Sequence, residues 1–317
     1  MGYGITIPFD GIPLSEHRSW VQELEDLGYS DVWSAEADGT DAFTPLALSA
    51  AWTSKLTLGT AIVPVFTRGP ALVAQSAAAL AEAAPGRFVL GIGTSSDVIV
   101  ERWNGVPFEE PYKRTRDMVR FLRLALAGEK VDEQFDTFRV RGFRLARPPA
   151  VVPPLLVAAL RPGMLRLASR EADGAITNWL SAADVSKVAG ELGEGKQLVA
   201  RVFVFPSEDT ATVRAIGRRM IAAYLNVPVY AAFHEWLGRG DRLGPMWSAW
   251  KAGDRKAALE AIPDSVVDEL ILHGSAPSVR EQVQAYLDAG VTTVTLAVVS
   301  AGIDLRAAVR ELSPSAI

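Results

Sequence analysis

The sequence predicts a single (β/α)₈ barrel, on three observations. Apolar runs rich in β-branched residues alternate with segments of helical period, which is the pattern of βαβ units in a parallel sheet. Eight such runs can be placed along the chain with no break in composition between them. The length of 317 residues suits one barrel. The alternative is an open, doubly wound sheet of about six strands.

The expected strands are short apolar runs bounded by turn residues: 3–8, 31–35, 56–63, 88–93, 155–159, 175–178, 198–205 and 293–299. Helices are expected at 16–27, 44–50, 70–83, 112–127, 163–170, 182–192, 209–224, 278–289 and 304–311. Gly28 and Gly290 each follow a helix where a left-handed residue would end it. Pro70 suits a helical first turn, where a missing N–H costs nothing.

Two stretches exceed the minimal repeat. Residues 130–145 alternate apolar and polar side chains, which predicts an antiparallel hairpin outside the barrel wall. Residues 206–272 are too long for one crossover and predict a helical insertion after the seventh strand, placed where it can cover the barrel mouth. With both insertions, residues 1–317 are expected to form one domain.

Composition narrows the functional classes. The net charge of −5 argues against a nucleic acid or an anionic membrane as partner, because both rely on basic surfaces. The absence of cysteine excludes disulfides, thiolate catalysis and Cys-ligated metals. The three histidines, His17, His234 and His273, lack metal-ligand spacing, so no metal is expected. With no leader and no spanning run, we expect a cytoplasmic protein with a small-molecule substrate, and a homodimer is the assembly to consider.

In such a barrel, function is expected where strands run into the loops that follow them. Glu36 is the only carboxylate directly at a strand end there, so it is the candidate for contact with a bound ring or for proton transfer. A loop salt bridge is the alternative. The glycines at 91 and 93 lack the third glycine of a dinucleotide fingerprint. They indicate either a tight strand exit or a loop in which Thr94 and Ser95 approach a ligand.

An anion site is predicted at 158–164, where a strand ends, a helix begins and Arg161 supplies a guanidinium. The alternative is a solvated arginine in an ordinary turn. Phe9, Trp103 and Trp179 are candidates to line the pocket of a planar substrate, with packing as the alternative for the two tryptophans. The chain has no G-x-S-x-G, H-E-x-x-H or Walker pattern, so hydrolase and nucleotide triphosphatase functions lack support.

Several motifs in order resemble the bacterial luciferase-like monooxygenase superfamily, and within it the branch that uses the deazaflavin coenzyme F420. They are Gly-Tyr-Ser-Asp-Val-Trp-Ser-Ala-Glu at 28–36, Leu-Gly-Thr-Ala-Ile-Val-Pro at 58–64, Pro-Gly-Arg-Phe-Val-Leu-Gly-Ile-Gly-Thr at 85–94, Glu-Ala-Asp-Gly at 171–174 and Asp-Ala-Gly-Val at 288–291. The resemblance covers nearly the whole chain.

This resemblance implies an F420-dependent oxidoreductase that transfers hydride to or from a small organic molecule, with the cofactor ring across the barrel mouth. It also implies a non-prolyl cis peptide at or beside Ala61–Ile62, pressing on one face of the ring. The implied cofactor-binding residues are Glu36, Ala61, Ile62, Val63, Gly93, Thr94, Ser95, Ala159, Leu160, Arg161, Gly163, Met164 and Asn178.

One departure concerns the catalytic acid. Many relatives in that branch end the second strand with an acidic residue followed by His, whereas this chain has Ala35–Glu36. We therefore take Glu36 as the candidate proton donor, in apolar surroundings that would disfavour its charged form. The alternatives are an FMN-dependent monooxygenase, a barrel that binds cofactor without turnover, and an NAD-dependent dehydrogenase with a Rossmann sheet.

Overall fold

The sheet of this protein closes on itself. In the computed structural model, which describes residues 1–316, strand β10 pairs in parallel with β9 on one side and with β12 on the other, and β12 pairs with β1. The barrel strands are β1 (Gly2–Thr6), β2 (Asp31–Ser34), β3 (Thr57–Thr60), β5 (Phe88–Gly93), β8 (Leu155–Ala158), β9 (Gly174–Asn178), β10 (Gln197–Phe205) and β12 (Thr293–Val298). The predicted (β/α)₈ barrel is confirmed, and the open sheet is excluded.

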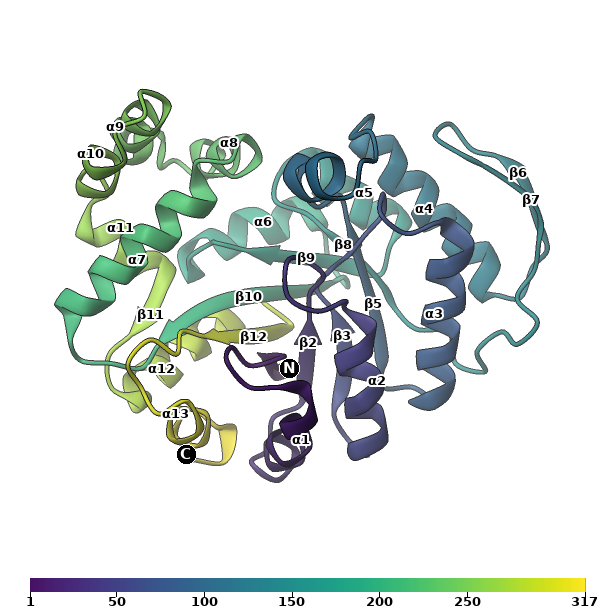
Figure 1. Cartoon of the computed structure of the whole chain (residues 1–317), viewed down its shortest axis with the longest axis horizontal. Helices are drawn as coiled ribbons and strands as arrows, with labels where there is room; N and C mark the ends of the chain where they lie inside the picture. The colour runs from purple at the N-terminus through teal and green to yellow at the C-terminus, as the bar shows by residue number, and fades with distance from the viewer. Residues whose placement is uncertain (317) are drawn as a thin grey trace.

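Helices surround this barrel, as Figure 1 shows. They are α1 (His17–Asp26), α2 (Phe43–Trp52), α3 (Pro70–Ala83), α4 (Pro111–Leu126), α5 (Pro162–Glu171), α6 (Val185–Leu192), α7 (Thr210–Leu225), α12 (Ala276–Asp288) and α13 (Leu305–Glu311). Each overlaps a predicted helix. Gly28 and Gly290 have φ angles of 82° and 112°, as expected of left-handed residues that end helices.

Two predicted strands end two or more residues earlier than expected. The first ends at Thr6, before a cis Ile7–Pro8 bond, where proline has no N–H to continue the ladder. The third is interrupted: β3 ends at Thr60, a non-prolyl cis bond joins Ala61 to Ile62, and the short β4 (Val63–Pro64) follows and pairs with β5. The continuous strand predicted at 56–63 is therefore wrong.

Large side chains fill the barrel interior, and glycines make room for them. Trp33, Val89, Leu156, Ile176 and Val199 come from five different strands and form one buried cluster. A Cβ atom at position 59 would lie 2.2 Å from the Trp33 ring, so only glycine fits there. Because side chains alternate along a strand, this cluster identifies which residues of each strand face inward.

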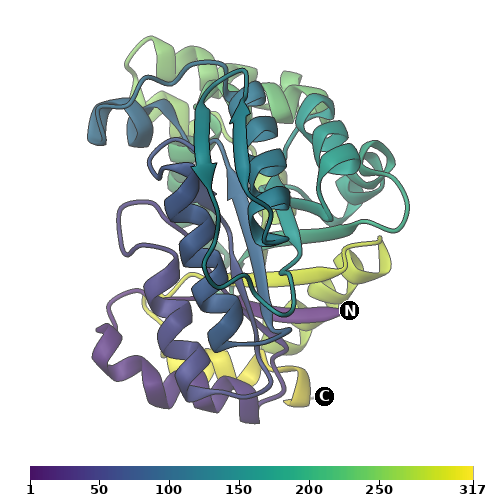
Figure 2. The same cartoon turned by 90° about the vertical axis from the view of Figure 1, so that its right-hand side faces the viewer.

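The two predicted insertions lie at opposite ends of the molecule (Figure 1). The hairpin, β6 (Val131–Gln134) paired with β7 (Arg139–Phe143), is antiparallel and separate from the barrel sheet, as expected, and it lies in front of α4 in Figure 2. The other insertion contains α8 (Pro228–Trp236), α9 (Gly240–Lys251), α10 (Arg255–Glu260), α11 (Asp264–Leu270) and a strand that was not predicted, β11 (Ile271–His273), which pairs with the end of β10.

The helical insertion packs on one side of the barrel. Its buried residues form a second core with α7 and with Trp179 and Phe203, which belong to the ends of β9 and β10. Within the described chain, the insertion therefore covers the barrel mouth near β9 and β10, and the loops after β2, β3 and β5 lie on the other side.

Candidate active site

The cis bond at Ala61–Ile62 places a bulge at the end of β3, as predicted. Ala61 N–H donates to Ser34 O (2.7 Å), and Glu36 N–H donates to Ile62 O (3.2 Å), so the bulge is tied to the end of β2. Ala61 and Ile62 pack on the interior cluster and remain partly exposed. A Cβ atom at Gly93 would lie 3.1 Å from Ile62 Cγ1, so glycine at this position leaves space for the bulge.

Glu36 is held by a guanidinium. Arg68 Nε lies 3.0 Å from both carboxylate oxygens of Glu36, and Arg68 Nη2 donates to Oε2 at 2.7 Å. Ala42 N–H also donates to Oε2, at 3.2 Å. The expected apolar surroundings that would disfavour the charged form are therefore wrong, and the salt-bridge alternative is the one observed. Both side chains are less than one-fifth exposed, so the pair is only weakly screened by solvent.

Arg68 belongs to a small network after β4. Its guanidinium lies over the Phe43 ring, 5.2 Å from the centroid, and 3.5 Å from Asp41 Oδ1. The hydrogen bonds to Glu36 raise the pKa of Arg68 above its ordinary value. The sequence places Arg68 in the loop after the third predicted strand, but no role was predicted for it.

The predicted anion site lies between neighbouring strands. Strands β5 and β8 pair directly, and a Cβ atom at Gly93 would lie 2.7 Å from Ala158 Cβ. The turn Thr94–Ser95 therefore lies beside the turn that begins at Ala159. Ser95 has a φ of 61°, and Thr94 Oγ1 donates to its carbonyl oxygen (3.2 Å).

The start of α5 is open to a ligand. Arg161 precedes the first helical residue; its side chain is exposed and has no hydrogen-bond or ion-pair partner within residues 1–316. A Cβ atom at Gly163 would meet no atom within 4 Å. Ala159 is buried, whereas Leu160 and Met164 are partly exposed beside it. A helix N-terminus with a free guanidinium and open space is suited to an anion.

Polar side chains on the opposite side of the barrel mouth were largely overlooked. Asn178 was predicted to border the site, and its Nδ2 donates to the Tyr230 hydroxyl of α8 (3.1 Å). Its register neighbour on β10 is Arg201, whose Nε donates to Thr6 Oγ1 on β1 (3.4 Å). A charged residue at an inward position of the otherwise apolar run 198–205 is the signal that could have identified Arg201.

The three aromatic candidates do not meet at one pocket. Phe9 is 5% exposed and packs against His17 and Trp20, in the core between the barrel and α1. Trp179 is 1% exposed, with its ring centroid 4.2 Å from that of Phe203. Trp103 ends the π-helix Val98–Trp103 and is 56% exposed. Packing accounts for Phe9 and Trp179, so their prediction as pocket-lining residues is wrong, whereas Trp103 remains available at the surface.

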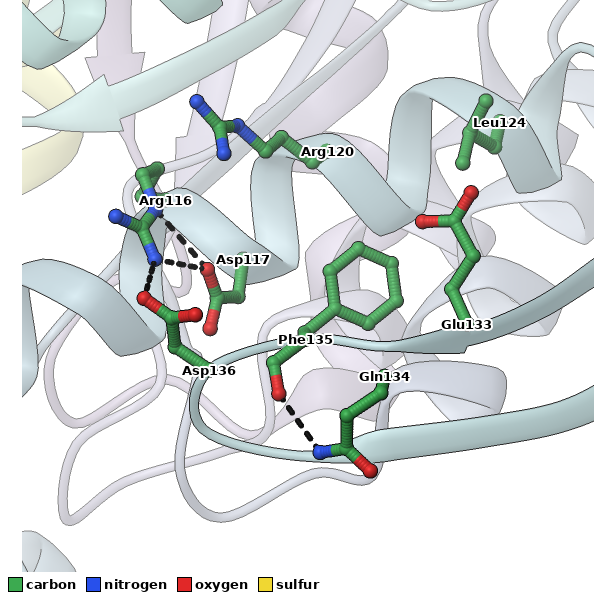
Figure 3. A pocket seen from close by; sticks show the side chains of 8 residues that line it. All are labelled: Arg116, Asp117, Arg120, Leu124, Glu133, Gln134, Phe135 and Asp136. Atoms are coloured by element: carbon green, nitrogen blue, oxygen red, sulfur yellow. Dashed lines mark hydrogen bonds and ion pairs between the residues drawn. The ribbon is translucent and has the colours of Figure 1, made fainter.

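A hollow of about 420 Å³ lies away from the barrel mouth, between α4 and the hairpin. Figure 3 shows Arg116 between Asp117 and Asp136, with Nη2 at 2.7 and 2.6 Å from their carboxylates. Asp117 also accepts hydrogen bonds from the backbone N–H and the hydroxyl of Thr137 (both 2.9 Å). These polar groups satisfy one another, so the network fastens the hairpin to the barrel.

Within residues 1–316, no group of three His, Asp or Glu side chains could hold a metal ion. No helix in the same range combines the length and apolar character needed to cross a bilayer.

The structure thus combines a (β/α)₈ barrel with a non-prolyl cis bulge after its third strand and an open helix start after its fifth. The chain belongs to the luciferase-like monooxygenase family, whose model matches residues 1–293. The predicted superfamily is therefore confirmed.

Individual relatives match nearly the whole chain. A Mycobacterium tuberculosis protein named "Putative coenzyme F420-dependent oxidoreductase" is 28% identical, over 95% of each chain. The 5,10-methylenetetrahydromethanopterin reductase of Methanolobus tindarius is 24% identical, over 93% of each. The solved structure of the coenzyme F420-dependent tetrahydromethanopterin reductase of Methanopyrus kandleri superimposes with a TM-score of 0.80, at 19% identity, over 99% of this chain and 97% of that one.

Proposed function

We propose that this protein is an F420-dependent oxidoreductase that transfers hydride between the deazaflavin and a small organic substrate at the barrel mouth. The single observation that carries this proposal is the space that Gly93 leaves beside Ile62 and Ala158 at the barrel mouth, in a chain that matches a protein named as a putative coenzyme F420-dependent oxidoreductase over 95% of both lengths. The relatives' names agree with the oxidoreductase class and the cofactor that the sequence predicted.

The residues present fit such a cofactor. Arg161 is exposed and unpartnered in the described chain, and the space over Gly163 is open, so an anionic phosphate can approach the start of α5. Thr94 and Ser95, on the neighbouring strand end, would hold the chain that links phosphate to ring. Ala61 and Ile62, which are partly exposed, would support one face of the ring, whereas Val63 is fully buried behind them. When bound, F420 supplies a carbon centre that gives or accepts hydride.

The residues of the chain would orient the reactants and exclude water. The bulge presents the partly exposed Ile62 side chain toward the mouth, and the insertion closes the side near β9. Glu36 lies beside the bulge, since its N–H donates to Ile62 O, and its side chain is paired with Arg68. Arg68 contacts both carboxylate oxygens of Glu36, so we assign the Glu36–Arg68 pair to shaping the pocket wall beside the bulge.

The decisive experiment is titration of the purified protein with F420 and, separately, with FMN. We expect quenching of F420 fluorescence with saturation, and bleaching or recovery of its absorbance when ketones, enones or alcohols are screened as substrates. Tighter binding of FMN, with NAD(P)H-dependent oxygen consumption, would instead indicate a flavin monooxygenase. A bound cofactor whose redox state responds to no substrate would indicate a barrel that binds without turnover.

A further inference from the structure

Arg201 faces the interior of the barrel at its mouth. Val199, two residues earlier on β10, belongs to the interior cluster, and alternate residues of a strand share a face. The contact from Arg201 Nε to Thr6 Oγ1 agrees with this direction. Strand β12 lies between β10 and β1, so this contact must cross the barrel interior.

The groups around Arg201 are neutral and polar. Asn178 and Thr295 are its register neighbours on β9 and β12, Thr6 is its hydrogen-bond partner, and Tyr230 is bonded to Asn178. We call Arg201 and these four residues, Asn178, Thr295, Thr6 and Tyr230, the donor cluster. Burial raises the pKa of Tyr230, against the opposing effects of Asn178 and the Arg201 charge, so this hydroxyl remains protonated at neutral pH.

The donor cluster lacks a counter-ion. No carboxylate within residues 1–316 forms an ion pair with Arg201, whereas Arg68 and Arg239, which are also largely shielded from solvent, are each paired with acidic residues. A partly buried cation without a carboxylate partner loses hydration, and the Thr6 hydroxyl and the Phe203 ring replace only part of that loss. Such an arrangement is costly for the free protein, and an anionic ligand would offset that cost.

The geometry of the guanidinium limits which anion fits. Its Cζ lies 4.8 Å from the Phe203 ring centroid, so the ring covers one face and the N–H groups in the guanidinium plane remain the available contacts. That edge matches the two oxygens of a carboxylate. Arg201 is the one cation of the donor cluster, which favours a single negative charge over a phosphate dianion.

We propose that the substrate of this barrel carries a carboxylate group, which binds Arg201 and is oriented by Asn178, Tyr230 and the threonine hydroxyls. The assignment rests on the proposed function for the view that this mouth is where the substrate reacts. Arg201 is thereby a specificity-determining residue: it selects acids over their neutral analogues and fixes the distance between the carboxylate and the reacting atom.

Binding of matched probes tests this proposal without knowledge of the natural substrate. The probes are crotonate with crotonamide and cinnamate with cinnamamide, titrated by calorimetry into the protein with and without F420. We expect at least one acid to bind roughly tenfold or more tightly than its amide. Arg201→Gln should remove that preference, and Arg201→Lys should retain part of it. Arg219→Gln, at an exposed position on α7, is the matched control and should change nothing.

Two further measurements separate this role from other possibilities. The melting temperature of Arg201→Gln should not fall, because the wild-type cation has no ion pair to lose, whereas a structural role predicts a clear decrease. F420 affinity should also stay unchanged; a loss of F420 binding in Arg201→Gln would assign the residue to the cofactor and overturn the proposal. Acids that bind no better than amides, or tighter binding of inorganic phosphate than of either acid, would also overturn it.

Failure of the wild-type protein to bind F420 would instead contradict the proposed function. The F420 titration reports that failure separately from the preference for acids.

Discussion

The two sides of the barrel mouth are built in different ways. On the side of β2, β3, β5 and β8, the site consists mainly of backbone features: a cis bulge, a glycine that makes room for it, and an open helix start. On the side of β9, β10, β12 and β1, it consists of side chains, with Arg201 among neutral donors and the insertion above. The first side can serve a constant cofactor, whereas side chains on the second can change with the substrate. Cofactor affinity and substrate selection should therefore separate experimentally.

The largest expected effect is on the backbone side. Gly93→Val should weaken F420 binding on the order of a hundredfold, because its Cβ atom would lie 2.7 Å from Ala158 Cβ and 3.1 Å from Ile62 Cγ1. Fluorescence titration measures the affinity. Gly93→Ala should give an intermediate loss.

Gly190→Ala, on α6, is the matched control, because its added Cβ would meet no atom within 4 Å. It should bind F420 as the wild type does. If Gly93→Val binds F420 normally while remaining folded, the bulge does not support the ring and the comparison between the two sides fails.

The next effect concerns the anion site. Arg161→Ala should weaken F420 binding by roughly 1.5–3 kcal/mol through loss of a charge-assisted hydrogen bond to the phosphate. Arg166→Ala is the control on the same helix, since Arg166 is exposed and already paired with Glu191. Equal F420 affinities for the two variants would mean that Arg161 is a solvated side chain that does not bind the phosphate.

The folding stability of the insertion side should decrease in acid. His234 is fully buried on α8, and its pKa is lowered to about 3, chiefly by burial and also by the Arg239 charge, with Asp184 opposing. The depressed value means that the unfolded chain binds the proton first, near its ordinary pKa of 6.5. Stability is therefore full above that pH and is lost as pH falls toward 3, by about 2 kcal/mol between pH 7 and pH 5.

Chemical denaturation of the wild type and His234→Leu at both pH values measures this effect. The variant removes the titrating ring, so the share of the pH dependence due to His234 should disappear. An unchanged pH dependence in His234→Leu would mean that other groups titrate in that range.

The two sides of the barrel mouth also differ in how much of each could be predicted from the sequence. The bulge, Gly93 and the turn with Arg161 lie in short continuous motifs. Strand order and local turn rules were enough to place the turn with Arg161, and the resemblance of the motifs to a known family implied the bulge. The pair Thr6–Arg201 joins residues 195 positions apart, and Asn178–Tyr230 joins residues 52 apart across the insertion. Such contacts exist only after the barrel closes and the insertion docks. The same reason explains why Phe9 was wrongly predicted to line the pocket, because its place in the core depends on how α1 packs against the barrel.

The smallest expected effect concerns Glu36, which is either the proton donor or a partner of Arg68 in the pocket wall. If Glu36 donated the proton, Glu36→Gln would lower kcat by about 10² to 10⁴, the usual contribution of a positioned general acid. Both of its oxygens instead accept hydrogen bonds from Arg68 at 2.7–3.0 Å, so the carboxylate is already engaged in the pocket wall. We therefore expect Glu36→Gln to reduce kcat less than roughly tenfold, with a larger change in KM as the wall beside the bulge loosens. Arg68→Gln should give a similar pattern, because either substitution breaks the same pair.

Steady-state kinetics with the substrate found in the F420 screen would measure both variants. A hundredfold loss of kcat in Glu36→Gln alone, with F420 affinity intact, would restore Glu36 as the acid and mean that the pair opens when substrate binds.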